Sequence, residues 1–212
     1  MLIFYFILII IISLGLKLYT VDFSIPPHSD DFGYILNAIQ YSEGDFFISQ
    51  KKNPGWSLFL TPFMSIINSS DFLDYSNFVR VLTITISTIT IFPMYVLARK
   101  FFNEKYSVIA ASLFAFEPHL NYNSGLGLSE PIFILGIILS SIFILQKNHN
   151  WYFYLSFLLA GIVWWTRFNG LVMVVILSIV FFVVYKPSSK NFLINVCNSE
   201  NLIIKPFLQL RE

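Results

Sequence analysis

The stretch VRVLTITISTITIFPMYVLA, residues 79–98, decides the fold of this chain. It is twenty residues long and contains a single charged residue, Arg80. A helix that crosses the hydrocarbon core of a bilayer needs about 20 mostly apolar residues. Pro93 lies inside the stretch, where a kink is tolerated because neighbouring groups satisfy the freed backbone. The stretch therefore predicts a membrane-spanning helix.

The composition of the whole chain also indicates a membrane protein. Hydrophobic residues make up 56% of the 212 residues and charged residues 12%, and the mean hydropathy is +0.71. A soluble domain has about 25% charged residues. With a net charge of +1 there is no basic face for a phosphate backbone, so we expect no nucleic-acid partner. The single cysteine, Cys197, excludes an internal disulfide and a thiolate metal cluster.

Five further apolar runs predict an all-α, polytopic transmembrane helical bundle with about six spans. These runs cover about 1–16, 106–120, 128–145, 151–165 and 170–185. The first run lacks the basic n-region and the cleavage site of a signal peptide, which favours an uncleaved anchor. We expect a membrane domain over residues 1–186, with a first loop at about 19–77. A polar tail follows at 187–212, and no pattern in it indicates a role.

Lysine and arginine near the ends of the spans predict the orientation, because cytoplasmic loops hold an excess of both. With six spans these residues fall on one side of the membrane: Arg99, Lys100, Lys105, Lys147, Lys186 and Lys190. That side is predicted to be cytoplasmic and to hold both termini. The first loop and the turn at Arg167 then face outward, and we expect a plasma-membrane location.

Three charged residues lie in or beside apolar runs on the predicted outer side: Glu117, Glu130 and Arg167. Charges at that depth are costly and usually face a cavity or one another. They are also compatible with a simple position at the edge of the membrane. The sequence leaves both interpretations open.

The first loop begins with a predicted surface helix. Ser29 is a good N-cap for a helix that starts at Asp30. An apolar stripe follows at i, i+3, i+4 and i+7, formed by Phe32, Ile35, Leu36 and Ile39. The helix is too short to span a bilayer and amphipathic, so we expect it along the membrane surface.

A second short helix is predicted from Asn53 and Pro54 to Ile67. Asn53 suits the cap and proline the first helical position. The run is too short to cross a bilayer, so an interfacial or re-entrant helix fits, with Trp56 at headgroup depth. Lys51 and Lys52 precede it, and they fit either the depth of lipid phosphates or a merely solvated position.

Asp30 and Asp31 have two competing interpretations. Acidic residues in a first turn complement the helix dipole, which is a structural role. A general base or a metal ligand is the functional interpretation, which two adjacent carboxylates favour. We expect no metal or other cofactor. The alternative is a divalent ion held by His28 with this pair, or by Glu117 with His119.

The order of several weak motifs resembles one enzyme family. The motifs are Asp30-Asp31 with Tyr34, Gly44-Asp45-Phe46, Lys52-Asn53-Pro54-Gly55-Trp56, Arg80, Pro93 to Phe102, Ser129-Glu130, and Leu159-Ala160-Gly161 through Arg167-Phe168-Asn169-Gly170. In this order they resemble the membrane-embedded C-type glycosyltransferases of the protein O-mannosyltransferase and aminoarabinose-transferase kind. The resemblance covers roughly residues 2–186.

The resemblance implies transfer of a sugar from a polyprenyl-phosphate carrier to a protein, lipid or glycan acceptor on the outer face. It implies Asp31 and Asp30 as catalytic carboxylates, one of them the base that takes the acceptor proton. Cations would spread the charge of the departing phosphate. The substrate-binding residues implied or fitting this chemistry are Tyr34, Lys52, Arg80, Glu130 and Arg167.

Two departures from the family pattern keep other functions open. The second acid is Asp31 rather than glutamate, and relatives have further spans, so we expect a fragment or a reduced form. A non-catalytic membrane bundle, such as an assembly subunit or a truncated pseudo-enzyme, is the main alternative. A transporter is a third possibility, although we find no paired interrupted helices in two halves.

Overall fold

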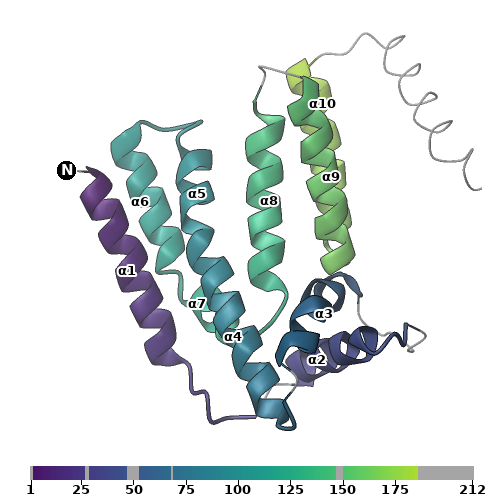
Figure 1. The fold of residues 1–212 in the computed structure, drawn as a ribbon. Helices are drawn as coiled ribbons and strands as arrows, with labels where there is room; N and C mark the ends of the chain where they lie inside the picture. Colours follow the sequence, from purple (N-terminus) through teal and green to yellow (C-terminus); the bar gives the residue numbers. More distant parts are fainter. Residues whose placement is uncertain (1, 27–28, 47–52, 68, 147–149, 186–212) are drawn as a thin grey trace, which may run out of the picture. The chain divides into compact units, whose positions relative to one another are not determined.

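The computed structural model describes residues 2–26, 29–46, 53–67, 69–146 and 150–185, and within these ranges the chain is α-helical without strands (Figure 1). The helices are α1 (Leu2–Thr20), α2 (Ser29–Ser42), α3 (Gly55–Ile67), α4 (Phe72–Ile89), α5 (Ile91–Ala98), α6 (Glu104–Ala115), α7 (Pro118–Ser124), α8 (Glu130–Ile144), α9 (Asn150–Thr166) and α10 (Gly170–Tyr185). Residues Met1–Leu177 form one compact unit, and the site described below lies within it. The predicted polar tail at 187–212 lies outside the described residues.

The predicted helix at 79–98 is confirmed, and it starts earlier than expected. Helices α4 and α5 together form an apolar helix from Phe72 to Ala98, 27 residues long, with a mean hydropathy of 1.9. The earlier start follows from Asp71, whose side chain accepts a hydrogen bond from the Leu73 amide at 2.9 Å and caps the helix. Among the described residues this is the single helix long and apolar enough to cross a membrane. The six-span arrangement therefore stays a prediction.

The predicted continuous helix at 106–120 is wrong at its C-terminal end. Helix α6 ends at Ala115, and the short α7 begins at Pro118. Glu117 lies between them in extended conformation, and its carboxylate accepts a hydrogen bond from the Leu120 amide at 2.5 Å. Proline at the first helical position and a capping acid before it favour a new helix start over continuation.

The two predicted short helices of the first loop exist as α2 and α3, and they pack on each other. In Figure 1, α2 runs crosswise to the neighbouring α4. The buried face of α2 is formed by Ile35 and Ala38, which contact the α3 residues Trp56 and Leu60 in one apolar cluster. Phe32 and Leu36 of the predicted stripe are exposed. The stripe is thus divided between the protein core and the surface.

A row of polar side chains on α4 connects this helix to four other segments. Ser76, Arg80, Thr83 and Ser87 are spaced at i, i+4, i+7 and i+11, which places them on one face, and all four are buried. We call these four residues the polar ladder of α4. Such side chains stay buried at low cost only when they are hydrogen-bonded.

The C-terminal half of the polar ladder, Thr83 and Ser87, contacts α1 and α7. The Thr83 hydroxyl donates to the Ser124 carbonyl oxygen at 2.7 Å, and the buried Lys17 ammonium donates to the Ser87 hydroxyl at 2.9 Å. The N-terminal half, Ser76 and Arg80, contacts Asp31 and the connection that precedes it.

Candidate functional site

Asp31 lies in the first turn of α2 and is fully buried, with 0% of its surface exposed. The Ser76 hydroxyl on α4 donates a hydrogen bond to Asp31 Oδ2 at 3.1 Å. A buried carboxylate needs such partners because the loss of hydration otherwise disfavours its charged form. This bond fixes the first turn of α2 against α4.

The turn between α7 and α8 covers Asp31 from a second direction. Gly127 in this turn has φ +75°, and a Cβ atom built on it would lie 2.7 Å from Asp31 Oδ1. The Gly127 carbonyl oxygen accepts a hydrogen bond from Trp56 Nε1 at 3.3 Å. Trp56 is fully buried within the protein, and its place at headgroup depth stays a prediction. Its indole anchors the turn that contacts Asp31.

Asp30, next to Asp31, is exposed. Successive residues on a helix point about 100° apart, so one acid of the pair faces the core and the other the surface. An exposed carboxylate is able to reach a proton on an external hydroxyl group without a rearrangement of the protein. Tyr34 lies one turn further along α2, half-buried against the apolar cluster of α2 and α3.

Glu130 and Arg167 form an ion pair between the start of α8 and the end of α9. Their side chains are 23% and 33% exposed, and the Arg167 guanidinium lies 5.7 Å from the centre of the Phe133 ring. These two of the three predicted charges therefore face each other. Glu117, the third, is instead used as the cap of α7.

The start of α3 lies against the end of α9. The Asn53 side-chain amide donates to the Trp164 carbonyl oxygen at 3.0 Å, although the two residues are 111 positions apart. A Cβ atom built on Gly55 would lie 2.6 Å from the Trp165 carbonyl oxygen, so only glycine permits this approach. The described part of the first motif, residues 53–56, thus meets residues 164–166 of the motif that runs from 159 to 170. Lys52 itself lies outside the described residues.

These contacts close into a ring around one end of the fold. Asp31 contacts Gly127, the turn continues to Glu130, and Glu130 pairs with Arg167. The residues just before Arg167 contact Asn53 and Gly55, and the next residue, Trp56, returns to Gly127. We call these residues the site ring: Asp31, Asn53, Gly55, Trp56, Gly127, Glu130 and Arg167. The ring brings together four segments that are distant in the sequence.

Arg80 is not in the site ring but beside it. Its two terminal nitrogens donate to the carbonyl oxygens of Asp22, Ile25 and Pro26 and to Asn77 Oδ1, at 2.9–3.3 Å. The Ser24 hydroxyl and amide, with a smaller contribution from Arg80, hold the pKa of Asp22 below its ordinary value. Arg80 therefore contacts the connection between α1 and α2.

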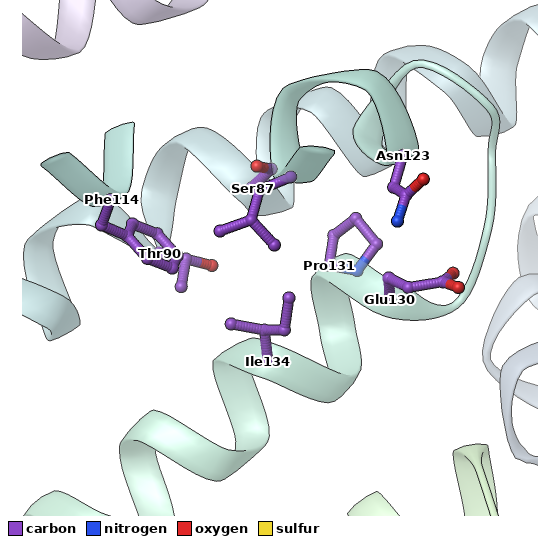
Figure 2. Close-up of a pocket in the computed structure, with 8 residues that line it drawn as sticks. Ser87, Thr90, Phe114, Asn123, Glu130, Pro131 and Ile134 are labelled. Atoms are coloured by element: carbon purple, nitrogen blue, oxygen red, sulfur yellow. The ribbon is translucent and has the colours of Figure 1, made fainter. Parts of the chain in front are cut away.

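Two of the hollows among the described residues concern the site. A groove of about 540 Å³ runs along the end of α1 and α7, with a mostly apolar lining that includes Leu16, Val21, Tyr122 and Leu126, and Asp22 and Arg80 also line it. A second hollow, near Glu130, has room for about one water molecule. Figure 2 shows the Glu130 carboxylate pointing away from Ile134. Glu130 lines this small hollow, and its carboxylate pairs with Arg167.

Two sets of residues were predicted as possible ligands of a divalent ion, and the structure describes only the second set, Glu117 and His119, completely. His28 lies outside the described residues. Glu117 caps α7 through its carboxylate, and His119 contacts the Asn123 amide through Nε2, so the two side chains have separate partners. Among the described residues no group of three histidine, cysteine or acidic side chains is placed to hold an ion.

Sequence reasoning did not identify Ser76 and Gly127. Ser76 lies before the apolar stretch at 79–98, so no sequence pattern indicated that it belongs to α4 and faces the protein interior. Gly127 lies in a Gly-Leu-Gly-Leu stretch, residues 125–128, where a turn glycine could have been suspected, but not its contact with Asp31.

The fold and the site together define a class: an α-helical protein with a membrane-length helix and an acidic and basic site formed by the loops at one end. The family follows from comparison with known proteins. The family model described as dolichyl-phosphate-mannose-protein mannosyltransferase matches residues 51–198, more than half of the chain. The chain belongs to this family, which confirms the resemblance in the motifs and implies a glycosyltransferase.

The matched region includes α3 to α10, with Arg80, Glu130 and Arg167. Asp30 and Asp31 lie before it. No curated protein and no solved structure matches the chain.

Proposed function

We propose that this protein transfers a sugar from a polyprenyl-phosphate carrier to a hydroxyl acceptor at the membrane boundary. The observation that supports this most is the site ring, which joins the first turn of α2 to Glu130, Arg167 and the start of α3. The family name points to dolichyl-phosphate-mannose as the donor and to a protein as the acceptor. A lipid or glycan acceptor fits the same chemistry.

Asp30 is the residue that we propose as the base. The acceptor oxygen forms a bond to C1 of the sugar, and the bond between C1 and the phosphate oxygen breaks with inversion at C1. The acceptor proton passes to Asp30, and the phosphate leaves with the bonding electron pair. A base contributes when it lies within hydrogen-bond reach of that proton, and exposure of Asp30 permits this.

Asp31 and Arg167 have supporting roles in this proposal. Asp31, buried between Ser76 and Gly127, fixes the turn that presents Asp30. The Arg167 guanidinium remains partly exposed beside Glu130 and stabilises charge on the departing phosphate, together with Lys52. Tyr34, half-buried against the apolar cluster of α2 and α3, is the substrate-binding residue that α2 adds to this proposal.

The membrane arrangement belongs to the same proposal. Helices α1, α4 with α5, α6, α8, α9 and α10 correspond to the six predicted spans, with the site on the outer face and both termini in the cytoplasm. The mostly apolar groove beside α1 and α7 is suited to the isoprenoid tail of the carrier, which is soluble only in an apolar environment.

Transfer of radiolabelled mannose from dolichyl-phosphate-mannose to a serine- and threonine-rich peptide, in membranes that contain the full chain, tests this function. We expect transfer by the native protein and a fall of about 10²–10⁴ in kcat for Asp30→Asn. Glu43→Gln is the matched control, because Glu43 is an exposed acid just after α2. A correctly inserted native chain that binds the carrier without transfer would favour the non-catalytic bundle instead.

A further inference from the structure

We propose that Arg80 is a positioning residue that clamps the connection between α1 and α2 onto α4. In this role it sets the position of Asp30 and does not contact the phosphate of the carrier. The effect of Arg80 on sugar transfer rests on the proposed function. The contact of Arg80 with the connection between α1 and α2 does not depend on it.

The hydrogen bonds of Arg80 engage both of its terminal nitrogens with protein oxygens. A guanidinium has five N–H groups, two on each terminal nitrogen and one on Nε. Nη1 donates to the Asp22 carbonyl and to Asn77 Oδ1, and Nη2 donates to the Ile25 and Pro26 carbonyls. Nε has no partner among the described residues and is buried from solvent. Arg80 as a whole is only 4% exposed.

The clamped carbonyls lie directly before the first turn of α2. Helix α1 ends at Thr20 and α2 begins at Ser29, so residues 22–26 form the middle of the connection. Arg80 lies one helical turn after Ser76 on the same face of α4, and Ser76 bonds to Asp31. The polar ladder thus contacts the chain at residues 22–26 and again at Asp31, next to Asp30. Contacts that fix Asp31 and the connection before α2 restrict the position of Asp30 before substrate binds.

Only arginine fits this arrangement. Three carbonyl oxygens at different positions are reached by a planar fork with donors on two nitrogens. Lysine has the same charge, but its donors lie on one compact group, so it does not replace a fork. Lysine does bind phosphate well as a point charge. The substitution Arg80→Lys therefore separates a clamp from a phosphate ligand.

The test uses the full chain in lipid nanodiscs, with Cys197→Ser and a nitroxide attached at Ile25→Cys. Ile25 is suitable because it is 55% exposed and Arg80 donates to its backbone carbonyl, which the substitution keeps. Electron paramagnetic resonance reports the mobility of the nitroxide in Arg80→Gln and Arg80→Lys. Arg99→Gln is the matched control, because Arg99 is exposed and its side chain donates a hydrogen bond to the nearby Phe102 carbonyl.

We expect both Arg80 variants to keep their helix content by circular dichroism while the nitroxide becomes mobile. The Arg99 control keeps an immobile nitroxide. In the transfer assay we expect kcat to fall about 100-fold in both Arg80 variants, with the KM for the donor unchanged, because misplacement by about 1 Å has that effect. A mobile nitroxide in the two variants supports the clamp even if no transfer is found in the native protein.

Three results would overturn the proposal. The first is an immobile nitroxide in both variants. The second is recovery of carrier binding and transfer by Arg80→Lys after loss in Arg80→Gln, which would make Arg80 a phosphate ligand. The third is loss of helix content in both variants, which would assign Arg80 to the stability of the whole fold.

Discussion

Gly127 and Asp31 are in contact although they lie on different elements: a Cβ atom on Gly127 would come within 2.7 Å of Asp31 Oδ1. The turn between α7 and α8 therefore forms a wall against the buried carboxylate. Trp56 holds this wall through its hydrogen bond to the Gly127 carbonyl, and Glu130 follows it three residues later. A small change in this turn thus affects both the acidic and the basic half of the site.

The substitution Gly127→Ala tests this contact. We expect the free energy of unfolding to fall by about 1–2 kcal/mol, because an alanine at positive φ is strained, and by more where the methyl group displaces Asp31. Thermal unfolding in detergent measures the change. Gly161→Ala is the control, since a Cβ there meets nothing within 4 Å. Equal unfolding midpoints for the two variants would show that the turn between α7 and α8 accommodates the methyl group without loss of stability.

Asp30 and Asp31 are predicted to differ in their effect on stability. Asp31→Asn keeps the shape of a buried side chain but changes its charge and its acceptor capacity, so we expect a lower unfolding midpoint as well as loss of transfer. Asp30→Asn, on the exposed side, is expected to lower transfer alone. Membrane insertion stays intact in both. If Asp31→Asn leaves both properties unchanged, the buried carboxylate has no role in the site.

Glu130 and Arg167 are predicted to act as a unit. Removal of either charge leaves the other uncompensated, so Glu130→Gln and Arg167→Met each lower the unfolding midpoint, and the double variant lowers it by less than the sum. A double-mutant cycle should give a coupling of about 1 kcal/mol, because both side chains are partly exposed. Additive effects would mean that the ion pair contributes nothing to the α8–α9 contact.

The sequence predicted the elements of the site better than their contacts. The helix at 79–98 was recognisable because twenty residues with a single charge match the length and hydrophobicity of a membrane-spanning helix. The start of α2 was recognisable from Ser29 and the acids after it. The meeting of Glu130 with Arg167 was one of two open interpretations, because charges beside apolar runs tend to pair.

The remaining contacts depend on how the helices pack, which local patterns do not specify. Hydropathy does not distinguish an aromatic ring buried in protein from one in lipid, so the burial of Trp56 within the protein was not predicted. The bond between Ser76 and Asp31 requires the register of α4 against α2. Arg80 matched a family motif, yet its guanidinium contacts backbone carbonyls that no sequence pattern marks.

Gly55→Ala is predicted to separate α3 from α9. A methyl group on residue 55 would lie 2.6 Å from the Trp165 carbonyl oxygen, and backbone on both sides prevents a local escape. In an exposed helix the same substitution usually stabilises, because alanine has the higher helix propensity. A fall of about 1–3 kcal/mol in the free energy of unfolding would therefore identify the steric clash rather than a change in propensity.

The consequence for the site follows from the neighbours of Gly55. Movement of α3 breaks the bond from Asn53 to the Trp164 carbonyl and withdraws Trp56 from Gly127. We expect weaker binding of a spin-labelled polyprenyl phosphate to Gly55→Ala, because Lys52 precedes this segment, and no change for Gly15→Ala, where a Cβ meets nothing within 4 Å. Equal binding by the two variants would show that the contact between α3 and α9 does not shape the donor site.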